Sequence, residues 1–285
     1  MLQKKRKRCS KTPLRELMSF VRRKNEKLYE SLKELDNLIG MTTLKNRIVE
    51  QIQFIILNKG SIDDHFLNTV LQGDPGTGKT SVAHILFRIW SSLDIFEKKT
   101  ELNILHRSDF VGSYMGHTSN KTKKILERYA GGVIFIDEAY SLSSSNRDDY
   151  GKEALDQLNS FISEQNGKTI VIIAGYEQEL EKHFFGVNPG LKRRFQWKFS
   201  IDKYSADELY QIFKFQLKKY NWDVENTKSL FEQYHDQFKY SGGDTLNIAF
   251  KAKLQYSKRN WKKQTIRKVL SYDDVKQAIQ QHLVN

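Results

Sequence analysis

The sequence predicts an α/β fold in which a doubly wound, five-stranded parallel sheet precedes a small C-terminal all-helical lid domain. Two continuous apolar runs, at 132–136 and 169–174, have the composition of strands buried on both faces. Such strands occur in parallel sheets that are covered by helices on each side. After residue 203 the strand signal stops, and Ser205 with Glu208 forms a capping box that opens a helix.

Strands and helices are expected to alternate through the first two thirds of the chain. Strands are predicted at 69–73, 103–106, 132–136, 169–174 and 196–201, and an amphipathic helix is predicted at 79–90. The C-terminal helices are predicted from Ser205 onwards and at 227–239, 245–258 and 272–283. We therefore divide the chain into a basic N-terminal tail and helix at 1–33, an α/β domain at 34–203, and a helical lid domain at 204–285.

Composition restricts the setting in which this chain works. Cys9 is the one cysteine among 285 residues, so no intramolecular disulfide can form, and a reducing, intracellular and cytoplasmic location is expected. No apolar run approaches the roughly 18 to 20 residues that a membrane helix needs, so no membrane association is expected. The basic N-terminus lacks the apolar segment of a secretory signal.

The net charge of +13 is concentrated at the two ends of the chain. Residues 1–30 contain 11 lysines and arginines against 3 acidic residues, and residues 251–285 contain 9 against 2. Such ends suit nucleic acid or acidic partners, although a solvated tail and a solvated helix face explain them equally simply. The basic block at 4–8 is of the nuclear-import or nucleic-acid type, and an organelle transit peptide is a further alternative.

A glycine-rich loop between the first predicted strand and its helix fits the phosphate-binding pattern G-x-x-x-x-G-K-[ST]. The loop reads Gly73-Asp74-Pro75-Gly76-Thr77-Gly78-Lys79-Thr80 and is followed by Ser81. Glycines let the backbone curl so that successive N–H groups face phosphate oxygens, and the helix N-terminus adds positive potential. The sequence therefore predicts ATP binding, with Lys79 on the β- and γ-phosphates and the Thr80 hydroxyl on Mg²⁺.

Two carboxylates follow the buried strand at 132–136. Asp137 and Glu138 lie where this strand ends, which is the edge at which open α/β sheets bind ligands. We expect Asp137 to hold Mg²⁺ and Glu138 to polarise the attacking water, because water needs a base to become a good nucleophile. About 60 residues after a phosphate loop, this pair predicts ATP hydrolysis.

Several further segments resemble the AAA+ ATPases of the CbbX/CfxQ type, a group that includes the sporulation stage V protein K-like ATPases. These segments are 110–118, Lys121-Thr122, 131–142, Ala174-Gly175-Tyr176, 188–191 and Arg194-Phe195, and they occur in the family's order. The resemblance runs from about residue 38 to about residue 258 and is strongest from 70 to 195.

The resemblance implies roles for individual residues. Arg194 matches the arginine finger, which reaches the ATP site of a neighbouring subunit, and the adjacent Arg193 is the rival candidate. Tyr114, Met115 and Gly116 match the aromatic-hydrophobic-glycine pore loop, which grips an extended chain.

Other segments match the family's nucleotide contacts less closely. Tyr176 stands where many AAA+ proteins carry a polar sensor residue, although an ordinary core tyrosine is an equal alternative. The segment 38–40 resembles the one that lines the adenine. The family's lid arginine that senses the γ-phosphate is missing from 241–247, and Lys251 or Lys253 is its expected substitute.

The function implied by this resemblance is a homo-hexameric, chaperone-like AAA+ ATPase that remodels a protein partner by pulling it through a central pore. The alternative is a nucleic-acid-associated AAA+ motor or loader that uses the basic termini. A non-catalytic scaffold is disfavoured by the presence of both Glu138 and Arg194. A GTPase is disfavoured because no Asn-Lys-x-Asp guanine motif occurs.

Overall fold

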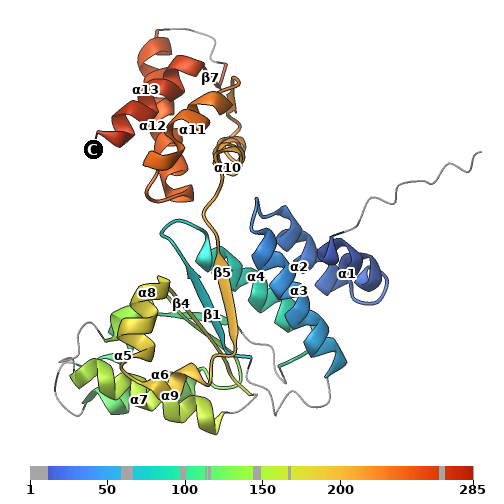
Figure 1. The fold of residues 1–285 in the computed structure, drawn as a ribbon, viewed down its shortest axis with the longest axis vertical. Helices are drawn as coiled ribbons and strands as arrows, with labels where there is room; N and C mark the ends of the chain where they lie inside the picture. Colours follow the sequence, from blue (N-terminus) through green and yellow to red (C-terminus); the bar gives the residue numbers. More distant parts are fainter. Residues whose placement is uncertain are drawn as a thin grey trace, which may run out of the picture.

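The computed structural model describes residues 12–58, 67–96, 101–112, 114, 117–143, 149–165, 168–262 and 267–284 (Figure 1). Three sequence features therefore lie outside the described residues: the basic block at 4–8, and Met115 and Gly116 of the expected pore loop. Within the described part, no helix is both long enough and apolar enough to cross a membrane.

A five-stranded parallel sheet forms the centre of the α/β part, as predicted. Its strands are β1 (Thr69–Gly73), β2 (Leu102–Leu105), β3 (Val133–Ile136), β4 (Ile170–Gly175) and β5 (Trp197–Ile201). Their order across the sheet is β2-β3-β4-β1-β5, and every neighbouring pair is parallel. β1 lies between β4 and the edge strand β5, which places the glycine-rich loop at the end of an interior strand.

Both faces of the sheet are covered, because successive side chains of a strand point to opposite sides. Val133 and Phe135 of β3 belong to one apolar core, whereas Ile134 and Ile136 belong to a second. The first core contains α3 (Thr42–Leu57) and α4 (Lys79–Ser92), and the second contains α7 (Asp149–Glu164). Smaller helices complete this part of the chain: α5 (Arg107–Phe110), α6 (His117–Arg128), α8 (Glu177–Leu180) and α9 (Pro189–Lys192).

Two N-terminal helices, α1 (Pro13–Val21) and α2 (Glu26–Asn37), join the first of these cores. Asn25 caps α2 by accepting a hydrogen bond from the N–H of Leu28 at 2.9 Å. The amide of the same Asn25 donates to the carbonyl oxygen of Ser92 at 2.6 Å, which ties the start of α2 to the end of α4. The helix that carries the phosphate loop is thus held from behind by the N-terminal helices.

The C-terminal lid contains α10 (Ala206–Lys218), α11 (Lys228–Tyr234), α12 (Gly242–Asn260) and α13 (Tyr272–Leu283). The predicted capping box is present, since Ser205 accepts from the N–H of Glu208 and Glu208 accepts from the N–H of Ser205. The lid also contains a parallel pair of two-residue strands, β6 (Asp223–Val224) and β7 (Val269–Leu270), which we did not predict. Two residues are too short for a recognisable hydrophobic period.

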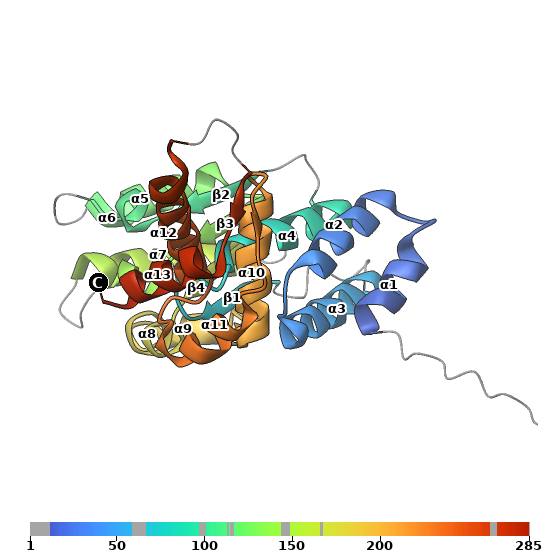
Figure 2. The same ribbon diagram turned by 90° about the horizontal axis from the view of Figure 1, so that it is seen from above.

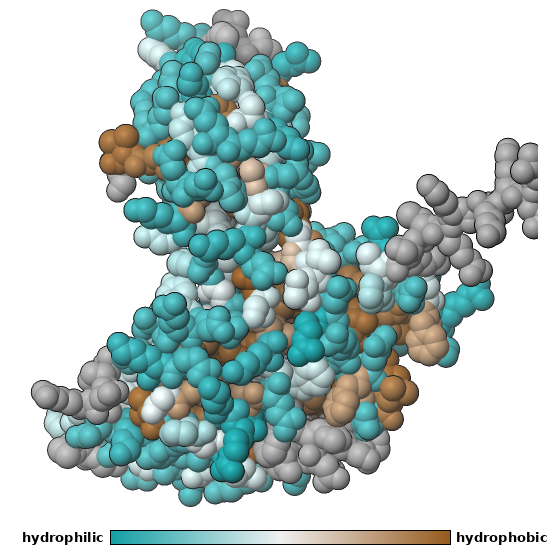
Figure 3. All heavy atoms as spheres, in the orientation of Figure 1, coloured by the Kyte–Doolittle hydropathy of each residue, from teal (hydrophilic) through white to brown (hydrophobic). Residues whose placement is uncertain are grey.

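The lid stands above the sheet and is joined to it by the segment that follows β5 (Figures 1 and 2). The space-filling view shows a waist between the two parts, at which apolar side chains are visible (Figure 3). The first turn of α12 comes against the glycine-rich loop, since a Cβ on Gly242 would lie 2.7 Å from the carbonyl oxygen of Gly76. The lid therefore closes over the edge of the sheet at which the predicted site lies.

Candidate nucleotide-binding site

The glycine-rich loop has the backbone geometry of a phosphate cradle. It connects the end of β1 at Gly73 to the start of α4 at Lys79. Gly76 has φ +69° and Gly78 has φ +93°, values at which a side chain would be strained. Thr77 is buried, and its hydroxyl donates to the carbonyl oxygen of Asp74 at 2.8 Å, which fixes the curl of the loop. The N–H groups at the start of α4 can then bind an anion.

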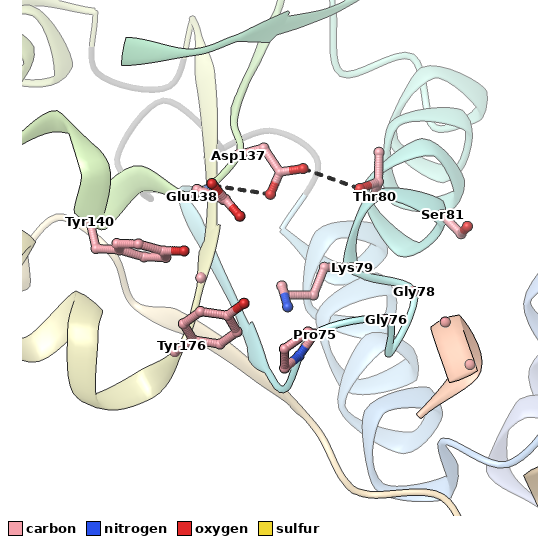
Figure 4. A pocket seen from close by; sticks show the side chains of 13 residues that line it. Pro75, Gly76, Gly78, Lys79, Thr80, Ser81, Asp137, Glu138, Tyr140 and Tyr176 are labelled. Atoms are coloured by element: carbon pink, nitrogen blue, oxygen red, sulfur yellow. Dashed lines mark hydrogen bonds between the residues drawn. The ribbon is translucent and has the colours of Figure 1, made fainter. Parts of the chain in front are cut away.

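Lys79 lies inside this curl (Figure 4). Its ammonium donates to the carbonyl oxygens of Gly73 at 2.8 Å and Asp74 at 2.9 Å. Burial lowers the pKa of Lys79, and the nearby carboxylates, with Asp137 the strongest, oppose that shift. The ammonium is therefore held in place by weak neutral acceptors, which phosphate oxygens can replace with stronger, charge-assisted bonds.

Thr80 and Asp137 meet across the mouth of the loop. The Thr80 hydroxyl donates to Oδ2 of Asp137 at 3.3 Å, and Oδ1 of Asp137 accepts from the N–H of Glu138 at 3.0 Å. A hydroxyl and a carboxylate on facing elements are oxygen ligands of the kind that Mg²⁺ takes together with phosphate and water. The residues present thus fit a magnesium ion.

Glu138 has a left-handed backbone, with φ +50°, although it is not a glycine. Such a conformation costs on the order of 1–3 kcal/mol and occurs often at functional sites. It turns the exposed Glu138 side chain off the end of β3 and toward the cavity (Figure 4).

Tyr140 and Tyr176 form the wall opposite α4. Their rings are stacked with centroids 5.4 Å apart, and the Tyr176 ring lies 5.2 Å from the ammonium of Lys79. Burial and the charge of Glu138 raise the pKa of both hydroxyls. Tyr176 was predicted at this site, but Tyr140 was not. Its signal was a tyrosine two residues after Glu138, in the segment that becomes the 3₁₀ turn Ala139–Leu142.

These groups line one cavity of about 400 Å³. Of the predicted site residues, its lining includes Pro75, Gly76, Gly78, Lys79, Thr80, Ser81, Asp137, Glu138 and Tyr176. Gly73, Asp74 and Thr77 shape the loop from behind and do not line the cavity. The two chain segments that we predicted separately, the glycine-rich loop and the carboxylate pair, therefore face one another across a space of suitable size for phosphates.

An adjoining hollow between the lid and α2 suits the base and ribose of a nucleotide. Leu38, Ile39 and Met41 line one side of it, and Ile212 and Phe215 of α10 line the other. The predicted 38–40 segment thus lies beside the phosphate loop, which also contributes to this hollow. Phe215, whose side chain is 66% exposed, gives the hollow an aromatic face that the sequence analysis missed.

The expected lysine substitutes for a lid sensor do not reach the phosphate cavity. Lys251 donates to the carbonyl oxygen of Gln281 at 2.9 Å, and Lys253 lies 4.9 Å from the ring of Tyr220. The lid side of the cavity is formed by Gly242 and Gly243 instead.

The two candidate finger arginines lie away from the cavity of their own chain. Arg194 is half-buried: its Nε donates to the hydroxyl of Ser163 at 2.8 Å and its Nη1 to the carbonyl oxygen of Gly190 at 2.7 Å. Arg193 is exposed. Neither arginine is among the described residues that line the cavity.

Tyr114 is 69% exposed and contacts the ring of His117 edge-to-face, with centroids 5.6 Å apart. It is the one expected pore-loop residue within the described part of the chain. Its position just before α6 leaves the aromatic ring at the surface, where another molecule can contact it.

Comparison with known proteins agrees with this geometry. A family model described as the ATPase family associated with various cellular activities (AAA) matches residues 69–202. A cfxQ-like protein of Acanthamoeba polyphaga mimivirus is 34% identical over 81% of this chain and 58% of its own length. Stage V sporulation protein K of Bacillus subtilis is 36% identical over 67% of this chain and 62% of its own length. The chain thus spans less than two thirds of these two relatives.

A third relative is the chloroplastic ribulose bisphosphate carboxylase/oxygenase activase of Cyanidioschyzon merolae, 36% identical over 74% of each chain. Among solved structures, the FIGL-1 AAA domain in complex with ADP has a TM-score of 0.61 and 22% identity, covering 86% of this chain and 82% of that one. The Thermotoga maritima RuvB branch migration motor has a TM-score of 0.62 and 20% identity, covering 86% and 70%. These structures show the fold alone.

The relatives and the family model confirm the family that the motifs indicated. The chain belongs to the CbbX/CfxQ family of AAA+ ATPases, which includes the stage V sporulation protein K-like proteins.

Proposed function

We propose that this chain binds ATP with Mg²⁺ in the cavity at the start of α4, hydrolyses the ATP in a homo-hexameric ring, and so remodels a protein partner. The observation that carries the proposal is the convergence of Lys79, the Thr80–Asp137 pair and Glu138 on one cavity. The relative named as an activase of ribulose bisphosphate carboxylase/oxygenase supports a protein partner. The single cysteine supports an intracellular, cytoplasmic setting.

Each converging side chain has a separate task in the proposed reaction. Lys79 holds the β- and γ-phosphates and offsets their charge. Thr80 and Asp137 hold Mg²⁺, which when bound neutralises charge on the phosphate oxygens. Glu138 accepts a proton from the attacking water.

The proposed ring of subunits supplies a second cation to each ATP site. We assign the finger to Arg194, which would leave Ser163 and Gly190 to reach the phosphates of the adjacent subunit. There its guanidinium would stabilise the charge that develops on the transferring phosphoryl group.

Tyr114 is the proposed grip on the partner. An exposed aromatic side chain at the pore of the hexamer would bind an extended chain through apolar and stacking contacts, with little regard to its sequence. The surface around it also contains His117, Lys121 and Lys124, so acidic segments would be favoured there.

The nucleic-acid alternative receives no specific support from the described residues. Three cations of the basic C-terminal segment have partners inside the lid: Lys251 bonds a carbonyl oxygen, Lys253 lies over aromatic rings, and Arg259 pairs with Asp274. These contacts favour an ordinary helix surface over a nucleic-acid interface.

The phosphate cradle is tested by Lys79→Ala. We expect calorimetry to show loss of ATP binding, because the phosphates lose their main cationic partner in the cavity. Lys203→Ala is the matched control: Lys203 pairs with Asp74 at 3.4 Å, but its side chain is 83% exposed, so affinity should change little. An unchanged dissociation constant for Lys79→Ala would contradict the assignment.

The two carboxylates are expected to behave differently. Glu138→Gln should retain ATP binding and lose turnover, because an amide cannot accept the proton of the attacking water. Asp137→Asn should also weaken magnesium-dependent binding, measured as the ATP affinity with and without Mg²⁺. If Glu138→Gln turns over ATP at the wild-type rate, another residue orients the water.

The finger and the ring are tested together by mixing subunits. Arg194→Ala should bind ATP normally, while hydrolysis should fall by roughly 10³. Adding Lys79→Ala subunits should restore part of the activity, since these donate Arg194 to the intact phosphate loops of the other variant. Arg193→Ala is the control and should retain activity. Full activity of Arg194→Ala, with loss in Arg193→Ala, would move the finger to Arg193.

The grip on the partner is tested in the Glu138→Gln background, which should hold ATP and the partner without release. A protein captured by this variant is identified, and its recovery is then compared after adding Tyr114→Ala or Tyr114→Phe. We expect Tyr114→Ala to lower recovery and Tyr114→Phe to preserve it, because phenylalanine keeps the aromatic face. Equal recovery of the partner with Tyr114→Ala and with Tyr114→Phe would argue against a role for the aromatic side chain.

A further inference from the structure

Two features place Tyr140 beside Glu138: a short 3₁₀ turn, and the lack of a side chain at Gly175. The N–H of Ser141 donates to the carbonyl oxygen of Glu138 at 2.7 Å, which begins the 3₁₀ turn and brings Tyr140 back toward the end of β4. A Cβ on Gly175 would lie 2.8 Å from Cδ1 of Tyr140, so the ring occupies space that any other residue at the end of β4 would fill. The ring position is thus defined by the backbone on one side.

The other side of the ring is defined by Tyr176. The two rings stack with an interplanar angle of 27°, and Tyr176 is itself next to the ammonium of Lys79. Figure 4 shows the hydroxyl of Tyr140 directed into the cavity, with Glu138 and Tyr176 on either side of it. Lys79, Tyr176, Tyr140 and Glu138 therefore form a continuous row from the phosphate-binding residue to the residue that is proposed to activate water.

The hydroxyl of Tyr140 is available as a donor in this row. Burial and the charge of Glu138 raise the pKa of Tyr140 well above its usual value, so the hydroxyl keeps its proton at neutral pH. One proton faces two acceptors, and the carboxylate of Glu138 is the stronger because it is charged.

We propose that Tyr140 is a positioning residue for Glu138, whose carboxylate it holds toward the phosphate cradle by donating a hydrogen bond from a ring that Gly175 and Tyr176 fix in place. The inference rests on the role proposed above for Glu138. Glu138 needs such a tether, because its side chain is exposed and otherwise free to rotate away from the attacking water.

The test is Tyr140→Phe, which removes the hydroxyl and retains the stacked ring. We expect kcat to fall about ten-fold, with the KM and the dissociation constant for ATP unchanged, because orientation of the base affects the chemical step alone. Tyr129→Phe is the matched control: Tyr129 is another half-buried tyrosine, but it lies outside the cavity, and its substitution should leave kcat unchanged. Equal melting temperatures establish that both variants fold.

A double-mutant cycle separates positioning from packing. In the Glu138→Gln background, single-turnover hydrolysis should be no slower with Tyr140→Phe than without it, because the residue on which Tyr140 acts is already inactive. An equal ten-fold loss in both backgrounds, an unchanged kcat in Tyr140→Phe, or a raised KM would each overturn the proposal. Wild-type turnover by Glu138→Gln alone would instead overturn the role of Glu138, and with it this inference.

Discussion

The site depends on a close approach of two stretches of backbone, the phosphate loop at Gly76 and the lid at 240–243. A Cβ on Gly76 would lie 2.2 Å from the carbonyl oxygen of Tyr240, so the lid can close to this distance only over a glycine. A second link runs from the Tyr204 hydroxyl, which donates to the carbonyl oxygen of Thr77 at 2.8 Å. Burial raises the pKa of Tyr204 to about 12, which keeps it a donor at neutral pH. Phosphate loop and lid are therefore coupled directly, without an intervening side chain at Gly76.

Inside this frame, the reactive groups hold one another in place. The Lys79 ammonium donates hydrogen bonds to the carbonyl oxygens of its own loop, and the Thr80 hydroxyl donates one to Asp137. These partners preserve the geometry, since each polar group already has an acceptor or donor of the right kind. Phosphate oxygens would replace neutral acceptors with charged ones and leave the framework unchanged. Pre-organisation of this kind is what makes electrostatic stabilisation of a transition state effective.

The sequence predicted the parts of the fold and site that are local in the chain. The signal lies within a few residues for the five strands, for the loop before Lys79 and for the Asp137–Glu138 pair. The observed sheet confirms the five predicted strands. The sequence analysis missed Tyr140, Phe215 and Gly242–Gly243 because their places depend on tertiary contacts. Tyr140 stacks on Tyr176, Phe215 of α10 lines the hollow beside the phosphate loop, and the start of α12 lines the phosphate cavity. A single sequence gives no local signal for such contacts. The β6–β7 pair was missed because two residues show no period.

Charge balance explains why the proposed reaction requires a neighbouring subunit. Among the described residues that line the phosphate cavity, Lys79 is the one cation, and it faces Asp137 and Glu138. ATP with magnesium remains an anion, and the transition state concentrates its charge on the transferring group. Among the described residues of the lid, no cationic side chain lines this cavity: Lys251 and Lys253 are engaged elsewhere, and Gly242 and Gly243 form the lid side. In the proposed reaction, a further cation would therefore come from a neighbouring subunit. Arg194, half-buried and hydrogen-bonded to Ser163 and Gly190, is the group that we propose for this role.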